Sequence, residues 1–168
     1  MTVATNDKQV IATNGTEVFC SPPATESSKP SPCSHEEADT RMMVHMVDAI
    51  EKGHNSLMIR ATDTDVIVLA VPTVVSLDLN ELWVSYGTEK NHKILPAHLF
   101  AKTLGTSKSK CLPVFHALTG CVTSLFTGHG KKTTWKTYDN FPDVTSTFME
   151  LKSTPSTVSN ESLAIIER

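Results

Sequence analysis

Two apolar runs separated by a short acidic loop constrain the fold of this chain more than any other feature. The first run covers residues 56–60, the second covers residues 66–71, and Asp63-Thr64-Asp65 stands between them. The first run predicts a short buried strand. The second has two interpretations, because its β-branched residues favour a strand while a helix bounded by Pro72 fits the same residues. In both cases the acidic loop follows a buried strand.

A helix is expected immediately before this strand. Residues 36–52 repeat apolar side chains at helical spacing, and Ser34 and Glu37 have the spacing of a capping box. Acidic residues in the first turn suit the positive end of the helix dipole, and Gly53 predicts the end of the helix. The expected helix therefore begins with negatively charged residues.

The remaining pattern alternates between extended and helical segments. Two strands joined by a polar turn and two helices are expected at residues 82–87, 92–95, 111–118 and 131–138. Between them, Pro96 fits the first turn of a helix that Gly105 ends. This order of elements predicts an α/β fold.

Composition divides the chain into three parts. Residues 1–33 are expected to be an irregular lead-in or linker, with a short strand within residues 8–19 and then a Pro- and Ser-rich stretch. Such a stretch buries too little apolar area to offset its ordering entropy. Residues 34–140 form the predicted α/β domain, and residues 141–168 a Ser/Thr-rich tail with one weak helix.

Charge and hydropathy limit the kinds of partner that the chain is expected to bind. The chain has 15 basic and 18 acidic residues, whereas nucleic-acid-binding domains are usually basic overall, so a nucleic-acid partner requires a local basic patch. No run approaches the roughly 18 apolar residues of a membrane span. The first residues also lack an apolar signal-peptide core. We therefore expect a soluble, intracellular protein without a membrane partner, in the nucleus or the cytoplasm.

Two acidic clusters are the strongest chemical signals. Glu37 and Asp39 lie at the start of the first helix, and Asp63 and Asp65 follow the buried strand. Open α/β sheets place their sites at the ends of parallel strands, and carboxylates gathered there bind Mg²⁺ or Mn²⁺. Such ions activate water for phosphodiester cleavage. Each cluster also has a purely structural interpretation, as helix-dipole stabilisation or as turn chemistry.

A third signal is the sequence Gly128-His129-Gly130-Lys131-Lys132. A Gly-x-Gly turn that opens a helix exposes backbone N–H groups, and the two lysines add positive charge for a phosphate. The alternative is a tight turn between helices with solvated lysines.

Isolated histidines and cysteines give weaker signals. His116 lies on a predicted apolar helix, where a hydrogen-bonded structural histidine is expected rather than a metal ligand. The cysteines contain no Cys-x-x-Cys pair, so zinc is not expected.

In their order along the chain, these motifs resemble the PIN-like, flap-endonuclease-type nucleases. They are more closely similar to uncharacterised invertebrate proteins, linked to mobile elements, that carry His-Glu-Glu-Ala-Asp-Thr-Arg, Asp-Thr-Asp-Val and Thr-Gly-Cys-Asp-Thr. The resemblance covers about residues 32–135. It implies an incomplete PIN-like parallel-sheet domain followed by a helical helix–turn–helix segment, and it makes residues 66–71 a helix.

The resemblance also implies roles for single residues. Glu37, Asp39, Asp63 and Asp65 would be the metal ligands and catalytic carboxylates, with Mg²⁺ or Mn²⁺ as the cofactor. The helix–turn–helix, with Gly128, Gly130, Lys131 and Lys132, would hold the nucleic-acid backbone, in some relatives with a K⁺ ion.

Two departures from the family pattern reduce the expected activity. Val122 stands where the family has an aspartate, and the acidic first strand that the family places before Ser34 has no counterpart. We therefore expect a degenerate or truncated metal-dependent nuclease-like domain whose cleavage is weak or absent.

Two other functions are compatible with the same residues. One is a non-catalytic interaction or nucleic-acid-binding domain that keeps the fold. The other is an Asp-x-Asp phosphotransferase of the haloacid-dehalogenase type, because Asp63-Thr64-Asp65 follows a strand. It ranks last, because residues 139–143 are a poor match to the later acidic motif that such enzymes need.

Overall fold

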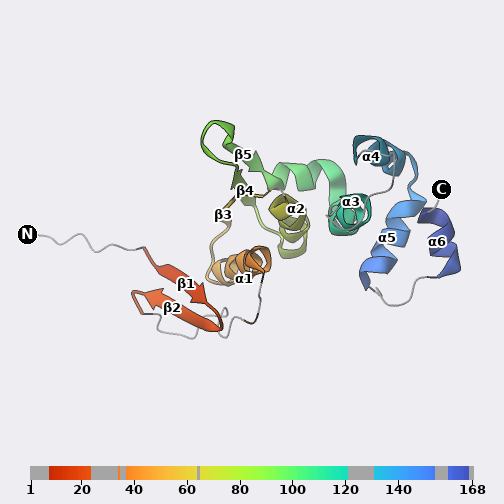
Figure 1. Ribbon diagram of the computed structural model, residues 1–168. Coiled ribbons are helices and arrows are strands. Elements are labelled where there is room, and N and C mark those ends of the chain that lie inside the picture. Colours follow the sequence, from red (N-terminus) through yellow and green to blue (C-terminus); the bar gives the residue numbers. More distant parts are fainter. Residues whose placement is uncertain are drawn as a thin grey trace, which may run out of the picture. The chain divides into compact units, whose positions relative to one another are not determined.

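The computed structural model describes residues 8–23, 34, 37–63, 65–120, 131–153 and 159–166, which fold into a mixed α/β structure (Figure 1). Two compact units are distinguished, Met1–Asn55 and Ser56–Arg168. The predicted α/β class is confirmed at this coarse level. Within the described part of the chain, no helix is both long and apolar enough to cross a membrane.

The first unit contains a β-hairpin and a helix. Strands β1 (Val10–Asn14) and β2 (Glu17–Ser21) pair antiparallel, and helix α1 follows at Ala38–Glu51. Where the sequence predicted one short strand, the structure has two, because Gly15 adopts a φ of 58° and reverses the chain between them. Thr13 Oγ1 of β1 lies 3.5 Å from His45 Nε2 of α1.

The start of α1 differs from its prediction. The capping box between Ser34 and Glu37 does not form, because Glu37 is itself the N-cap residue, with an extended backbone and no side-chain capping bond. Thr40 Oγ1 instead donates to the Glu37 carbonyl oxygen at 2.8 Å. The end of the helix agrees with its prediction, since Gly53 takes a φ of 91° and its N–H donates to the carbonyl of Ile50.

The second unit is built on a three-stranded sheet with the order β3-β4-β5. Strands β3 (Ser56–Ala61) and β4 (Glu81–Tyr86) are parallel, and β5 (Lys93–Pro96) runs antiparallel to β4. The strand after Asn55 and the later strand pair are therefore where the sequence predicted them.

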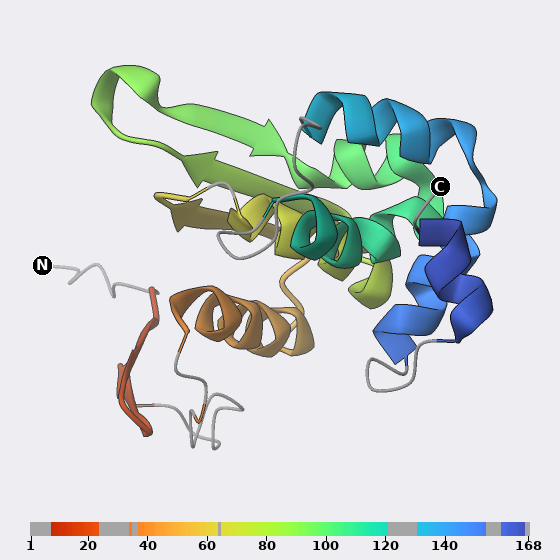
Figure 2. The ribbon, with the colours of Figure 1, turned by 45° about the vertical axis from the view of Figure 1, so that its right-hand side comes forward.

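Helix α2 (Asp65–Leu77) connects the two parallel strands and packs against β4 and α3 (Figures 1 and 2). The helical interpretation of residues 66–71 is thus confirmed. Its predicted end at Pro72 is wrong, because the helix continues to Leu77 through a buried proline. Val66, Ala70 and Val71 are almost fully buried, and this burial offsets the backbone hydrogen bond that proline cannot make.

Helix α3 (Ala97–Gly120) contains a kink at Gly105, whose φ of 74° and ψ of 169° are not helical. The first half of α3 is anchored on the sheet, where His98 Nδ1 lies 3.1 Å from the Leu82 carbonyl oxygen. The predicted break at Gly105 is confirmed, but the second helical segment begins before its predicted start at Cys111.

Three more helices follow, at Lys131–Asn140 (α4), Asp143–Ser153 (α5) and Asn160–Ile166 (α6). The tail was predicted to hold one weak helix, and the structure has two there. A second hydrophobic core joins α3, α4 and α5 through Cys111, Phe115, Tyr138 and Phe148. Burial of these aromatic residues is what gives the Ser/Thr-rich tail its helices.

Gly87 follows β4 in a conformation that only glycine fits well. Its φ is 87°, and a Cβ atom there would lie 2.5 Å from the backbone oxygen of Asn91. We predict that Gly87→Ala lowers the free energy of unfolding by about 2–4 kcal/mol, because it adds a backbone clash to the positive-φ strain. Urea unfolding measures this difference. Gly53→Ala is the matched control, since Gly53 also has a positive φ, of 91°, but no atom lies within 4 Å of the added Cβ. This variant should therefore lose clearly less free energy of unfolding. Equal losses in the two variants would contradict the role of the clash.

Candidate functional site

The carboxyl ends of β3 and β4 lie at the same edge of the sheet, because the two strands are parallel. An open polar depression occurs at this edge. It is lined by residues that follow the two strands or begin β5, namely Thr62, Asp63, Tyr86, Gly87, Asn91 and Lys93. This is the position at which open α/β sheets bind their ligands.

The turn between β4 and β5 forms one wall of the depression. It contains the short 3-10 helix η1 (Glu89–Asn91), and the Asn91 N–H donates to the Thr88 carbonyl at 2.9 Å. Ser85 Oγ and His92 Nε2 lie 2.7 Å apart, which ties the turn to β4. Lys93 is paired with Tyr86 in the sheet register, so its exposed ammonium group belongs to the same edge as Asp63.

Asp63 and Asp65 are brought together by the loop that joins β3 to α2. The Asp65 N–H donates to Asp63 Oδ1 at 3.2 Å, as in an Asx turn. Asp65 is also the acidic residue in the first turn of α2, where a negative charge stabilises the helix dipole. Both aspartates thus have structural roles, and both remain exposed enough to meet a ligand.

His116, from the second half of α3, lies next to this pair. Its Nε2 is 3.5 Å from Asp65 Oδ2, while the Asp65 side chain is 51% exposed. The same Nε2 atom is buried without a hydrogen-bond partner among the described residues. The sequence predicted a hydrogen-bonded structural histidine at this position. The Nε2 atom of His116 does not agree with that prediction. The sequence did not indicate this neighbour of Asp65, because no local pattern links the second half of α3 to a loop so far away along the chain.

The four predicted metal ligands fall into two pairs. Glu37 and Asp39 lie at the start of α1 in the first unit, whereas Asp63 and Asp65 lie in the second unit. Among the described residues, no group of three or more His, Cys, Asp or Glu side chains is arranged to hold a metal ion. Mg²⁺ is often bound by only one or two carboxylates with several waters, so the pair Asp63 and Asp65 suits a weak, largely hydrated site.

The predicted phosphate-binding sequence is only partly described. Gly128, His129 and Gly130 lie outside the described residues, as do Cys121 and Val122. Lys131 and Lys132 are exposed in the first turn of α4. Positive side chains there oppose the helix dipole, and a bound anion would relieve this repulsion.

Cys111 can be set aside as a nucleophile. Its thiol is buried in the core of the C-terminal helices, where Sγ donates to the Thr145 carbonyl oxygen at 3.5 Å. Burial raises the pKa of Cys111 above its usual value of 9.0. The neutral thiol is therefore favoured, and a neutral thiol is a poor nucleophile.

Comparisons with known protein families, with curated proteins and with solved structures found no match to this chain.

The buried thiol and its aromatic neighbour predict a loss of stability at alkaline pH. Burial also raises the pKa of Tyr138 above its usual 10.0, so the folded state holds both protons more strongly than the unfolded state. Their contribution is complete below the unfolded values and is lost as pH rises through the folded ones. The free energy of unfolding should fall above pH 9.0, by at most about 1.4 kcal/mol per pH unit for each proton.

Urea unfolding at successive pH values measures this slope. Cys111→Ala should make the initial decline shallower, because only Tyr138 then contributes and it titrates at higher pH. An unchanged slope in this variant would show that Cys111 is not the group responsible.

Proposed function

We propose that this chain is a degenerate nuclease-like domain of the PIN-like type, which binds Mg²⁺ or Mn²⁺ weakly through Asp63 and Asp65 and cleaves phosphodiesters weakly or not at all. The observation that supports the proposal best is the place of the two aspartates. They follow β3 at the edge where the parallel strands β3 and β4 both end, beside the polar depression.

The local order of elements also supports the proposal. A helix that begins next to Glu37 and Asp39 leads into β3, and the Asp-Thr-Asp loop then leads directly into α2. This is the order that the resemblance implies for the acidic half of such a nuclease. The helical state of residues 66–71 agrees with the same expectation.

A divalent ion at this edge would have oxygen ligands of the kind it prefers. Two carboxylates neutralise its charge, and waters complete its coordination. Lys93 lies in the same depression as Asp63, so a phosphate bound to the ion would meet a positive charge on its other side. The partner in this proposal is therefore a nucleic acid, DNA or RNA, held at the sheet edge and further along by Lys131 and Lys132.

Weak or absent cleavage follows from the number of carboxylates. Cleavage by two metal ions requires a set of acidic ligands that holds both ions about 4 Å apart. Asp63 and Asp65 form only a pair, and Val122 replaces the aspartate that the family pattern has at that position. A single loosely held ion can neutralise phosphate charge, but it stabilises the leaving oxygen less well.

The second candidate is a non-catalytic interaction or nucleic-acid-binding domain that keeps this fold. The observation in its favour is that both aspartates stabilise the local fold: Asp63 accepts a hydrogen bond from the Asp65 N–H, and Asp65 begins α2. In that case the aspartates persist as turn and helix-start residues, and no ion binds them.

A titration with Mn²⁺ separates the two candidates. We predict saturable binding by calorimetry or by electron paramagnetic resonance, weakened at least about tenfold in Asp63→Asn/Asp65→Asn, which corresponds to about 1.4 kcal/mol. The double variant Asp78→Asn/Asp143→Asn is the matched control, because it removes the same charge from two exposed positions elsewhere in the second unit. Binding that the control weakens equally would be nonspecific, and no binding to the wild type would favour the interaction domain.

A gain-of-function variant tests the ancestry directly. If Val122 stands in place of a lost metal ligand, Val122→Asp should tighten Mn²⁺ binding by about tenfold, because it adds a charged oxygen ligand. Cleavage of flap and single-stranded substrates should rise in parallel. Val122→Asn has a similar shape without the charge and serves as the control. Metal affinity that is the same in all three proteins would contradict the proposed nuclease ancestry.

A further inference from the structure

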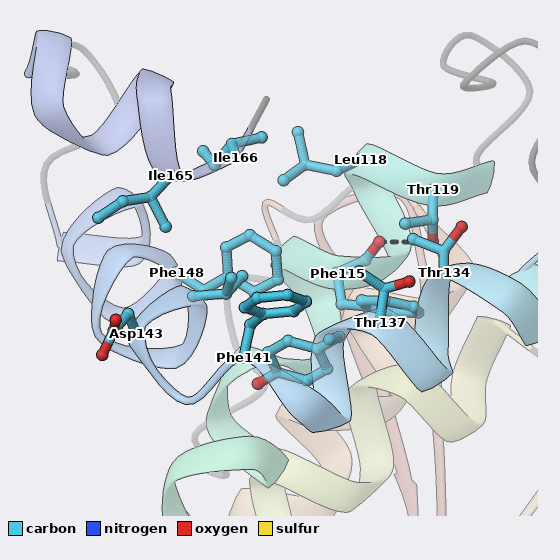
Figure 3. Close-up of a pocket in the computed structure, with 12 residues that line it drawn as sticks. Phe115, Leu118, Thr119, Thr134, Thr137, Phe141, Asp143, Phe148, Ile165 and Ile166 are labelled. Carbon is cyan, nitrogen blue, oxygen red and sulfur yellow. Dashed lines mark hydrogen bonds between the residues drawn. The ribbon is translucent and has the colours of Figure 1, made fainter. Parts of the chain in front are cut away.

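A partly open apolar cavity lies among the C-terminal helices. Its volume is about 100 Å³, and its walls come from α3, α4, α5 and α6 (Figure 3). Leu118, Ile165 and Ile166 lie on one side of it, and the rings of Phe115, Phe141 and Phe148 face them in the close-up. Nothing in the proposed nuclease function uses this space.

The aromatic wall is rigidly built. Tyr138 stacks on Phe115, with ring centroids 5.4 Å apart, and on Phe148, at 5.3 Å. These three rings are buried, whereas Phe141 at the border of the cavity is 52% exposed. A stacked, buried wall keeps its shape.

The polar groups around the cavity are already satisfied or turned away. Thr119 Oγ1 donates to the Phe115 carbonyl at 2.7 Å, and Thr137 Oγ1 donates to the Thr133 carbonyl at 3.3 Å. Asp143 is exposed and points away from the rings (Figure 3). A trapped water needs two to four polar partners, and these side chains offer few. The cavity therefore favours an apolar occupant over water.

We propose that this cavity is a binding site for a neutral, single-ring aromatic molecule. An apolar cavity of roughly 150 Å³ takes up benzene, and the present cavity, at about 100 Å³, has about two thirds of that volume and is partly open. An aromatic ring gains offset-stacked or edge-to-face contacts from the phenylalanine rings that line the space. A carboxylate ligand would lose its hydration without a compensating partner and would meet the carboxylate of Asp143 among the lining residues, so the lining disfavours an anionic compound.

Benzene and phenol are the probes, and benzoate is the charged control of the same shape. Methyl-labelled protein reports binding through the NMR signals of Leu118, Ile165 and Ile166. Trp135 gives a second signal by fluorescence, because its ring contacts Phe115 at a centroid distance of 5.0 Å. We expect saturable shifts of these signals with benzene and phenol below their solubility limits, a rise in Tm with ligand concentration, and no effect of benzoate.

Three variants locate the binding. Val144→Phe places a ring into the cavity and should weaken benzene binding at least about tenfold. Ile166→Ala enlarges the cavity and should let it accept a larger aromatic molecule such as toluene or indole. Leu151→Ala is the matched control, because Leu151 packs against the same core without lining the cavity, and it should leave the affinity unchanged.

The benzene titrations of the wild type and the variants test whether the cavity is the binding site. Saturable binding that Val144→Phe removes and Leu151→Ala keeps supports the site. The proposal is overturned if benzene shifts no signal to saturation in either the wild type or Ile166→Ala, or if a folded Val144→Phe binds it as well as the wild type. Should Val144→Phe fail to fold, the wild type and Ile166→Ala still give the decision.

Discussion

Burial of one face of α2 is the interaction on which the second unit depends. Val66 and Ala70 of this helix are fully buried, as are Leu82 and Val84 of the central strand β4, against which the helix packs. Each of the valine and leucine side chains contributes about 1.5–3 kcal/mol when it leaves water. This packing holds β3 and β4 parallel, and it fixes where the loop between β3 and α2 must lie. The acidic pair reaches the edge of the sheet because of this hydrophobic contact.

Helix α3 joins two cores that have different chemical character. Its first half, anchored on β4 through His98, buries the small aliphatic side chains of Ala97 and Ala101, and its second half supplies Cys111 and Phe115 to the aromatic core. Gly105 allows the change of direction between these halves, because its backbone conformation is one that residues with a Cβ rarely adopt. One helix thereby places His116 beside Asp65 and Leu118 beside the cavity.

Local signals in the sequence predicted the elements that local physics determines. The strand before Asp63 and the breaks at Gly53 and Gly105 were found because apolar runs and glycines act within a few residues. The predictions that were wrong concern contacts between residues far apart in the sequence. Pro72 remains helical because its neighbours are buried by other elements, and the tail folds into two helices because Phe148 packs on Tyr138. The contact between His116 and Asp65 belongs to the same class, because it exists only once α3 has packed on α2.

The candidate site, too, could be predicted only in part from the sequence. The sequence identified the carboxylates from their position after a buried strand, but it gave no indication of Lys93 or of the turn that surrounds them. Those residues join the site through the register of β4 and β5, which pairs Tyr86 with Lys93. Register is set by side-chain alternation on both strands and by turn length, so one strand alone does not reveal it.

The position of β3 in the sheet has a consequence for the solution behaviour of the protein. β3 ends the sheet on one side and has only β4 as a neighbour among the described strands. The unpaired backbone groups of an edge strand can pair with a strand of another molecule, and the exposed apolar side chain of Met58 favours such association. Arg60, exposed on the same strand, opposes such pairing, because a second copy would bring an identical charge close to it. Among the described strands, the charge of Arg60 therefore disfavours self-association through β3.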